Sequence, residues 1–194
     1  MAHSGKTPSS HFFFFAARPP EDVAEQMADA WQTLGTGEKL RRDKLHMTIL
    51  LVADVSVVPE GLVDLLLNVG AAVTCPVFDV QLDRLATWRH GRARNNPLVL
   101  TVAGGRSVEG EALAAALLSA LPEDLRWPRW RLVPHVTLAY GKGFGDDITL
   151  PQPIHWQIDS FTLTESLRGV GRHIPLASWR LNRAPDDPAS GGKQ

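Results

Sequence analysis

The sequence predicts an α+β protein in which mainly antiparallel sheets are backed by helices. The first observation is that strand-like and helix-like stretches come in interleaved groups rather than in strict alternation. The second is that a short pattern of His, apolar, Thr, apolar occurs twice, at His46–Ile49 and at His135–Leu138. The two copies are 89 residues apart, nearly half of the 194-residue chain, which indicates two related halves.

The first half of the chain predicts two strands, each followed by a helix. An aromatic run at residues 11–17 predicts the opening strand, and Pro19-Pro20 end it. Acidic residues at 21 and 22 suit a helix N-terminus, and an apolar stripe continues this helix towards Gly35. The first motif lies in the second strand, and a leucine-rich stripe over residues 59–69 predicts the second helix.

The second half predicts a hairpin, a third helix and three further strands. Alternation over 76–87 and the apolar run 97–102 predict strands around a turn at 91–96. A helix is expected at 109–121. Gly104–Ser107 is expected to form the turn into this helix, because the Gly-Lys-Ser/Thr ending of a P-loop is missing. The remaining predicted strands are the second motif, 154–166 and 173–181, the last two joined by a turn at 169–171.

Composition and charge narrow the class of protein. The polar ends at 1–10 and 184–194 are expected to be disordered tails, which leaves 11–183 as one domain. The formal net charge is −1, so no overall positive field argues for nucleic acid or an anionic membrane. Cys75 is the only cysteine, which excludes an internal disulfide and fits a cytoplasmic location. The apolar run at 12–17 is too short to span a bilayer.

The motif itself indicates a site for one small anion. Side chains alternate along a strand, so the His and the Thr of each copy share one face and lie roughly 7 Å apart. That spacing suits two groups that touch one ligand of phosphate size. In the second copy, the opposite and apolar face is expected to hold Pro134, Val136, Leu138 and Tyr140.

The paired motif resembles the signature of the two-histidine (2H) phosphoesterase superfamily. Within that superfamily the chain is similar to the RNA 2′,3′-cyclic phosphodiesterases, which are also called 2′-5′ RNA ligases. Supporting features are Phe14-Phe15-Ala16 followed by Pro19-Pro20, Pro134 before the second His, Phe161-Thr162-Leu163 and Trp179-Arg180-Leu181. The resemblance implies a bilobal fold with pseudo-twofold symmetry, in which each lobe supplies one motif strand to a central cleft. It also implies hydrolysis without a metal or nucleotide cofactor.

The expected reaction opens a 2′,3′-cyclic phosphate at an RNA end to a 2′-phosphate. One imidazole must accept a proton from water and the other must donate one to the leaving ribose oxygen. Following the family pattern, we assign His46 as the donor and His135 as the base, although the residues alone do not distinguish them. Thr48 and Thr137 are expected to donate hydrogen bonds to the non-bridging oxygens. The same groups could run the reverse reaction, 2′-5′ ligation of RNA.

Further residues are candidates for substrate binding. Phe14 could stack a base, with burial in the core as the alternative. The family often has Arg five residues before the second His and an aromatic residue three before it, where this chain has Trp130 and Leu132. The neighbouring Arg129 and Arg131 could replace that arginine. Tyr140 is a fourth candidate. A basic rim for RNA phosphates, or only a solvated loop, is expected from Arg84, Arg89, His90, Arg92 and Arg94.

Three other functions fit part of the pattern. A 2H enzyme for a small cyclic nucleotide or a 2′-5′ linked oligonucleotide would have the same fold and the same four residues. A non-catalytic RNA-binding module would not need both intact motifs. A zinc hydrolase could add His155 or His173 to the motif histidines, but no closely spaced ligand pair supports it. No membrane and no obligate protein partner is expected.

Overall fold

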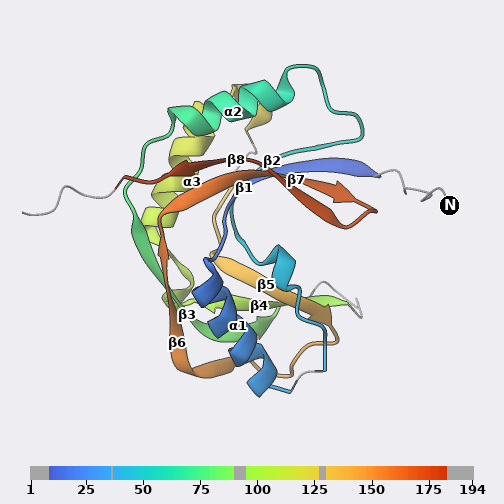
Figure 1. The fold of residues 1–194 in the computed structure, drawn as a ribbon, viewed down its shortest axis with the longest axis vertical. Coiled ribbons are helices and arrows are strands. Elements are labelled where there is room, and N and C mark those ends of the chain that lie inside the picture. Colours follow the sequence, from blue (N-terminus) through green and yellow to red (C-terminus); the bar gives the residue numbers. More distant parts are fainter. Residues whose placement is uncertain (1–8, 36, 90–94, 127–129, 183–194) are drawn as a thin grey trace, which may run out of the picture.

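The protein is described by a computed structural model over residues 9–35, 37–89, 95–126 and 130–182 (Figure 1). Most of the two expected tails lies outside the described residues, as do Arg129 and the rim residues His90, Arg92 and Arg94. The end of the first expected tail belongs to the sheet. Ser9 donates its backbone N–H to the carbonyl of Arg168 at 2.8 Å, and the first strand begins at Ser10.

Eight antiparallel strands of the described chain form two four-stranded halves. The strands are β1 (Ser10–Ala17), β2 (Met47–Val55), β3 (Phe78–Thr87), β4 (Asn96–Val102), β5 (His135–Gly141), β6 (Ile148–Ile158), β7 (Ser160–Arg168) and β8 (Arg172–Arg180). One half has the order β2-β1-β7-β8 and the other has the order β5-β4-β3-β6. Within the described residues, β2 joins β5 through one antiparallel residue pair, Met47 with Val136. This pair links the halves at the two motifs. The predicted α+β class with antiparallel sheets is confirmed.

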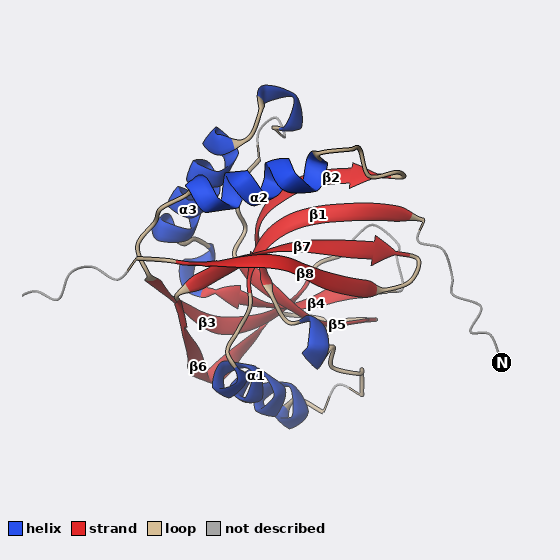
Figure 2. Cartoon of the chain, turned by 45° about the horizontal axis from the view of Figure 1, so that its top comes forward, coloured by secondary structure: helices blue, strands red, loops and turns tan. Residues whose placement is uncertain are grey.

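The helices cross between the halves. They are α1 (Glu21–Thr33), α2 (Leu62–Ala72) and α3 (Val108–Ala120). Helix α1 follows β1 but packs against β6, and α3 follows β4 but packs against β2, each in the opposite half. Figures 1 and 2 show α2 and α3 together on one side of the molecule and α1 on the other. This reciprocal exchange places strand, helix and motif strand in the same relation in both halves. None of the helices in the described ranges combines the length and apolarity that crossing a bilayer requires.

Apolar periodicity in the sequence explains the packing of these elements. The stripe of α1 buries Val23, Met27 and Trp31, and alternate residues of β3 are buried. Ser107 caps α3, because its Oγ accepts the backbone N–H of Gly110 at 3.1 Å. This cap confirms that the glycine-rich segment is a turn into a helix.

The prediction of one strand over 154–166 was wrong. The segment divides between β6 and β7, which end and begin on either side of Asp159. The two strands lie in different halves, because β6 pairs with β3 whereas β7 pairs with β1 and β8. Strand β6 also begins six residues earlier than predicted and contains two prolines, at 151 and 153. They are tolerated because β6 is an edge strand, and its register with β3 shifts there.

Candidate active site

The two motifs meet where the halves of the sheet join. His46 directly precedes β2, and His135 is the first residue of β5. Because the bridging pair of Met47 and Val136 is antiparallel, the two histidines lie on either side of it. Both residues of that pair are fully buried. Strand alternation therefore turns the histidines and threonines of both motifs to the opposite face, where all four side chains are only partly buried.

Each motif histidine is held by the same local hydrogen bond. Nδ1 of His46 lies 2.7 Å from the carbonyl oxygen of Lys44, and Nδ1 of His135 lies 2.7 Å from the carbonyl oxygen of Val133. A carbonyl only accepts, so Nδ1 must carry the hydrogen in both rings. Nε2 of each histidine is thereby left to exchange a proton with a ligand.

Aromatic rings fix the orientation of both imidazoles. Phe14 stacks on His46 with ring centroids 5.0 Å apart, and His173 of β8 meets His46 edge-on at 5.4 Å. Trp88, just after β3, packs against His135 at 4.0 Å. These neighbours restrict ring rotation and remove water from one side of each histidine.

Burial lowers the pKa of both motif histidines in the free protein. It is the main reason why the pKa of His46 falls from 6.5 to about 4. Repulsion from His173 and His135 adds to the lowering, which shows that the two motifs are close enough to interact electrostatically. Burial also lowers the pKa of His135. The pKa of His173 falls to about 4 through burial first and then through the charges of Lys44 and other nearby cations.

The motif threonines are suitably placed to bind the same ligand. Thr48 and Thr137 are each half-buried, two residues after their histidines. Neither hydroxyl has a hydrogen-bond partner among the described residues, so both are available to an incoming oxygen.

Phe14 does not face solvent as a base-stacking residue would. It is only 3 % exposed and lies beneath His46, so the core alternative applies, and its ring supports the histidine. Sequence reasoning missed two ring neighbours in this role. His173 was considered only as a metal ligand, and Trp88 was given no role at the motifs. No spacing pattern marks either residue, because the sheet register and the β3–β4 hairpin bring them to the motifs.

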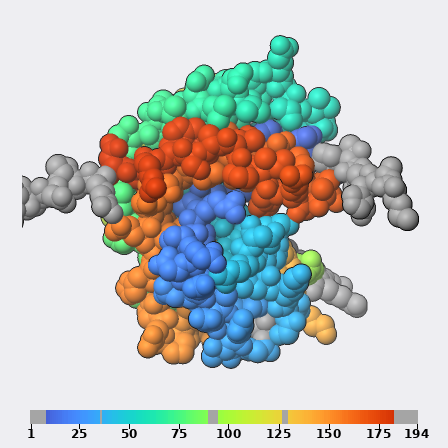
Figure 3. Space-filling view, in the orientation of Figure 1, coloured from blue at the N-terminus to red at the C-terminus, as the bar shows by residue number. Residues whose placement is uncertain are grey.

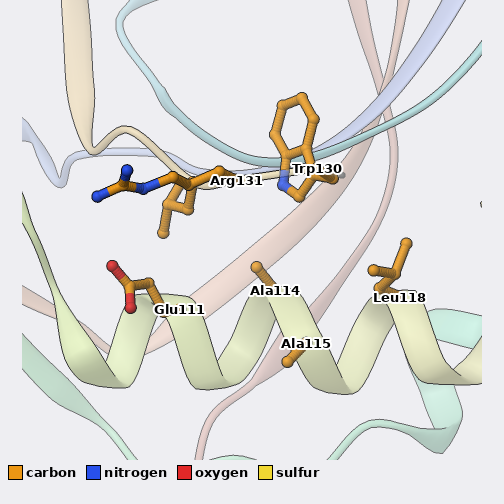
Figure 4. Close-up of a pocket in the computed structure, with 7 residues that line it drawn as sticks. Glu111, Ala114, Ala115, Leu118, Trp130 and Arg131 are labelled. Atoms are coloured by element: carbon orange, nitrogen blue, oxygen red, sulfur yellow. The ribbon is translucent and has the colours of Figure 1, made fainter. Parts of the chain in front are cut away.

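Arg131 lies beside α3 rather than beside the histidines. It lines a pocket with Glu111 and Trp130, and Figure 4 shows Arg131 and Trp130 facing the side of α3 that carries Glu111. The Trp130 indole donates to the carbonyl of Ile49 at 3.2 Å, and Leu132 is buried. Trp130 and Leu132 therefore attach the segment before β5 to the core. The family often has arginine and an aromatic residue at these two positions.

Tyr140 is turned out of the expected apolar face. A register shift between β4 and β5 opposite Leu138 inserts one residue, which reverses the alternation that follows. Tyr140 is consequently 41 % exposed, and the guanidinium of Arg41 lies 4.9 Å from the centre of its ring. Val136 and Leu138, before and at the shift, are buried as predicted.

The remaining histidines do not assemble a metal centre in the described residues. No group of three or more His, Cys, Asp or Glu side chains in these ranges is arranged to hold a metal ion. His155 is exposed on β6 and pairs with Gln81 across the strands.

Comparison with known proteins places the chain in a family. The family model described as the 2′-5′ RNA ligase superfamily matches residues 19–170. The chain belongs to the 2′-5′ RNA ligase superfamily. This confirms the resemblance inferred from the motifs, and the superfamily is one of 2H phosphoesterase enzymes.

Relatives in this superfamily cover nearly the whole chain. The RNA 2′,3′-cyclic phosphodiesterase of Escherichia coli (strain K12) is 26% identical over 184 residues, covering 88% of this chain and 96% of the relative. The crystal structure of E. coli LigT in apo form is 26% identical, with a TM-score of 0.64 over 90% of this chain and 99% of that one. TT0787 of Thermus thermophilus shares the fold at 23% identity, with a TM-score of 0.69 over 89% and 98%.

Proposed function

We propose that this member of the 2′-5′ RNA ligase superfamily hydrolyses 2′,3′-cyclic phosphate ends of RNA to 2′-phosphates without a metal. The observation that supports this most directly is the matched presentation of the two histidines. Each donates from Nδ1 to a carbonyl two residues earlier and leaves Nε2 free beside the junction of the halves. The E. coli relative is named as an RNA 2′,3′-cyclic phosphodiesterase, which is the same reaction class.

The proposed step moves two protons across one phosphorus. Water attacks the phosphorus as His135 removes a proton from it, and a new P–O bond forms. The bond from phosphorus to the 3′ oxygen breaks, and protonated His46 gives its proton to that oxygen. The hydroxyls of Thr48 and Thr137 stabilise the negative charge on the non-bridging oxygens. The product has a 2′-phosphate and a 3′-hydroxyl, and His46 and His135 have exchanged protonation states.

Single substitutions of the motif histidines test this scheme. His46→Ala and His135→Ala should each lower kcat on RNA with a 2′,3′-cyclic end by roughly 10²- to 10⁴-fold, because each removes one proton transfer. His155→Ala is the matched control, since this exposed histidine of β6 should not affect turnover. Phosphorus NMR identifies the product. Near-normal turnover by either motif variant, or formation of a 3′-phosphate, contradicts the proposal.

Two further measurements define the reaction. Turnover should persist in excess chelator, and loss that only an added divalent cation restores would contradict metal independence. RNA with a 5′-hydroxyl and RNA with a 2′,3′-cyclic end, at high concentration, should yield a small amount of 2′-5′ linked product. Such ligation must disappear in the same histidine variants, because the 5′-hydroxyl takes the place of water as the nucleophile and the same two proton transfers are needed.

A further inference from the structure

A narrow hollow with basic walls lies beside His46. It is lined by Phe14, Arg18, Lys44, His46, Thr164 and His173. Neither His135 nor the two motif threonines line it, so it lies outside the position proposed for the reacting phosphate. In Figure 3 the red and orange β7–β8 hairpin borders the blue and cyan segments at this face of the molecule.

The positive charges around this hollow are not neutralised by ion pairs. No carboxylate lies within ion-pair distance of Arg18, Arg41 or Lys44 in the part of the chain that the structure describes. Their side chains contact neutral partners instead: Arg18 donates to the carbonyl of Asp43 at 3.2 Å, and Lys44 donates to the carbonyl of Gly171. All three cations lower the pKa of His173, and the carboxylate of Asp43 opposes them.

Clustered cations repel one another and destabilise the protein that holds them unless an anion binds between them. The proposed reaction uses none of Arg18, Lys44 and His173. Arg18 is exposed and Lys44 and His173 are half-buried, so a ligand can reach all three. The hollow is narrow, so an anion would lie at its mouth, where the long side chains of Arg18 and Lys44 can close on it.

We propose that Arg18, Lys44 and His173 form a second phosphate subsite, which binds the phosphate on the 5′ side of the nucleotide that bears the reacting phosphate. The proposal rests on the proposed function, because that function places the reacting phosphate between His46 and His135. The rings of His46 and His173 have centroids 5.4 Å apart, so a ligand with two phosphates joined through one ribose can contact both. A cyclic mononucleotide without a 5′-phosphate leaves this subsite empty.

Calorimetric binding of two matched ligands tests the subsite. Adenosine 2′-monophosphate fills only the reacting position, whereas adenosine 2′,5′-bisphosphate adds the 5′-phosphate. The second phosphate should tighten binding about tenfold at low salt, as charge-assisted hydrogen bonds do, and the advantage should shrink at high salt. Arg18→Gln and Lys44→Met should each reduce the advantage at least about threefold. A dinucleotide with a terminal 2′-phosphate shows whether a phosphodiester is accepted as well as a monoester.

Arg172→Gln is the control for a general loss of positive charge. Arg172 is the neighbour of His173 on β8, so its side chain points to the other face of the strand. This variant should keep the full advantage of the bisphosphate. Equal affinity of the natural protein for both ligands overturns the proposal, as does an equal loss for both ligands in Arg18→Gln and Lys44→Met. Because binding does not require turnover, failure of every hydrolysis assay would refute the proposed function and leave this ratio measurable.

Discussion

Binding of an anion should restore the proton on His46. In the free protein the pKa of His46 is about 4, so roughly one His46 ring in a thousand is protonated at pH 7. Protonating the ring at that pH costs about 4 kcal/mol. An anion in contact with Nε2 favours the charged imidazole. A return of the pKa of His46 to its ordinary value would therefore tighten anion binding to the protonated form roughly 300-fold, or by about 3.4 kcal/mol.

Sulfate is the suitable probe, because its charge does not change over the relevant pH range. NMR titration of the imidazole C–H resonances should give a pKa near 4 for His46 in the free protein and a pKa about two units higher at saturating sulfate. The affinity for sulfate should rise as the pH is lowered from 7 to 5. His46→Asn identifies the resonance and should remove most of this pH dependence. A pKa above about 6 in the free protein, or the same pKa in both states, would refute the reasoning.

Burial and packing lead to three further predictions. The folded-state pKa of His46 is below its ordinary value, so the free energy of unfolding should be greatest above pH 6.5. It should then fall as the pH is lowered from 6.5 to about 4. Urea denaturation should show a loss of up to about 3 kcal/mol over this range and a smaller loss in His46→Asn. Gly70→Ala should destabilise the folded protein by about 1–3 kcal/mol, because the new Cβ would overlap a tryptophan ring of β8. Gly145→Ala is the control: its new Cβ would contact no other residue, so its melting temperature should equal that of the natural protein. Trp88→Ala should expose His135 and raise its pKa, which would move the acidic limb of the pH profile of kcat/KM to higher pH. Trp88→Phe should move this limb less. An unmoved limb in Trp88→Ala would mean that His135 is not the base.

The sequence was most informative where side-chain periodicity decides the structure. The alternation of β3 and the apolar stripe of α1 depend on one buried face each, so the elements were predicted within a few residues. The join of β6 and β7 could not be predicted in the same way. Strand-forming residues continue through Asp159, and only the different pairing partners in the two halves divide the segment.

The candidate site shows the same limit. Two copies of one motif pattern indicated that His46 and His135 act together, and the charge of His135 does reach His46 in the folded chain. The sequence offered no sign that His173 would meet His46. That contact depends on the register of β7 with β8 and of β1 with β7, which no local pattern specifies.

Folding also makes the two motif histidines unequal, although their sequences are alike. His46 lies against His173 and feels the charge of Arg18, whereas the lowering of the pKa of His135 comes from burial alone. A buried histidine beside a cation stays neutral until an anion arrives, and it becomes a protonated donor only in the complex. A base must be neutral when water attacks, and the lowering of the pKa of His135 by burial favours its neutral form. The asymmetry therefore supports His46 as the donor, since burial and the nearby charge of Arg18 lower its pKa in the free protein and a bound phosphate would raise it again.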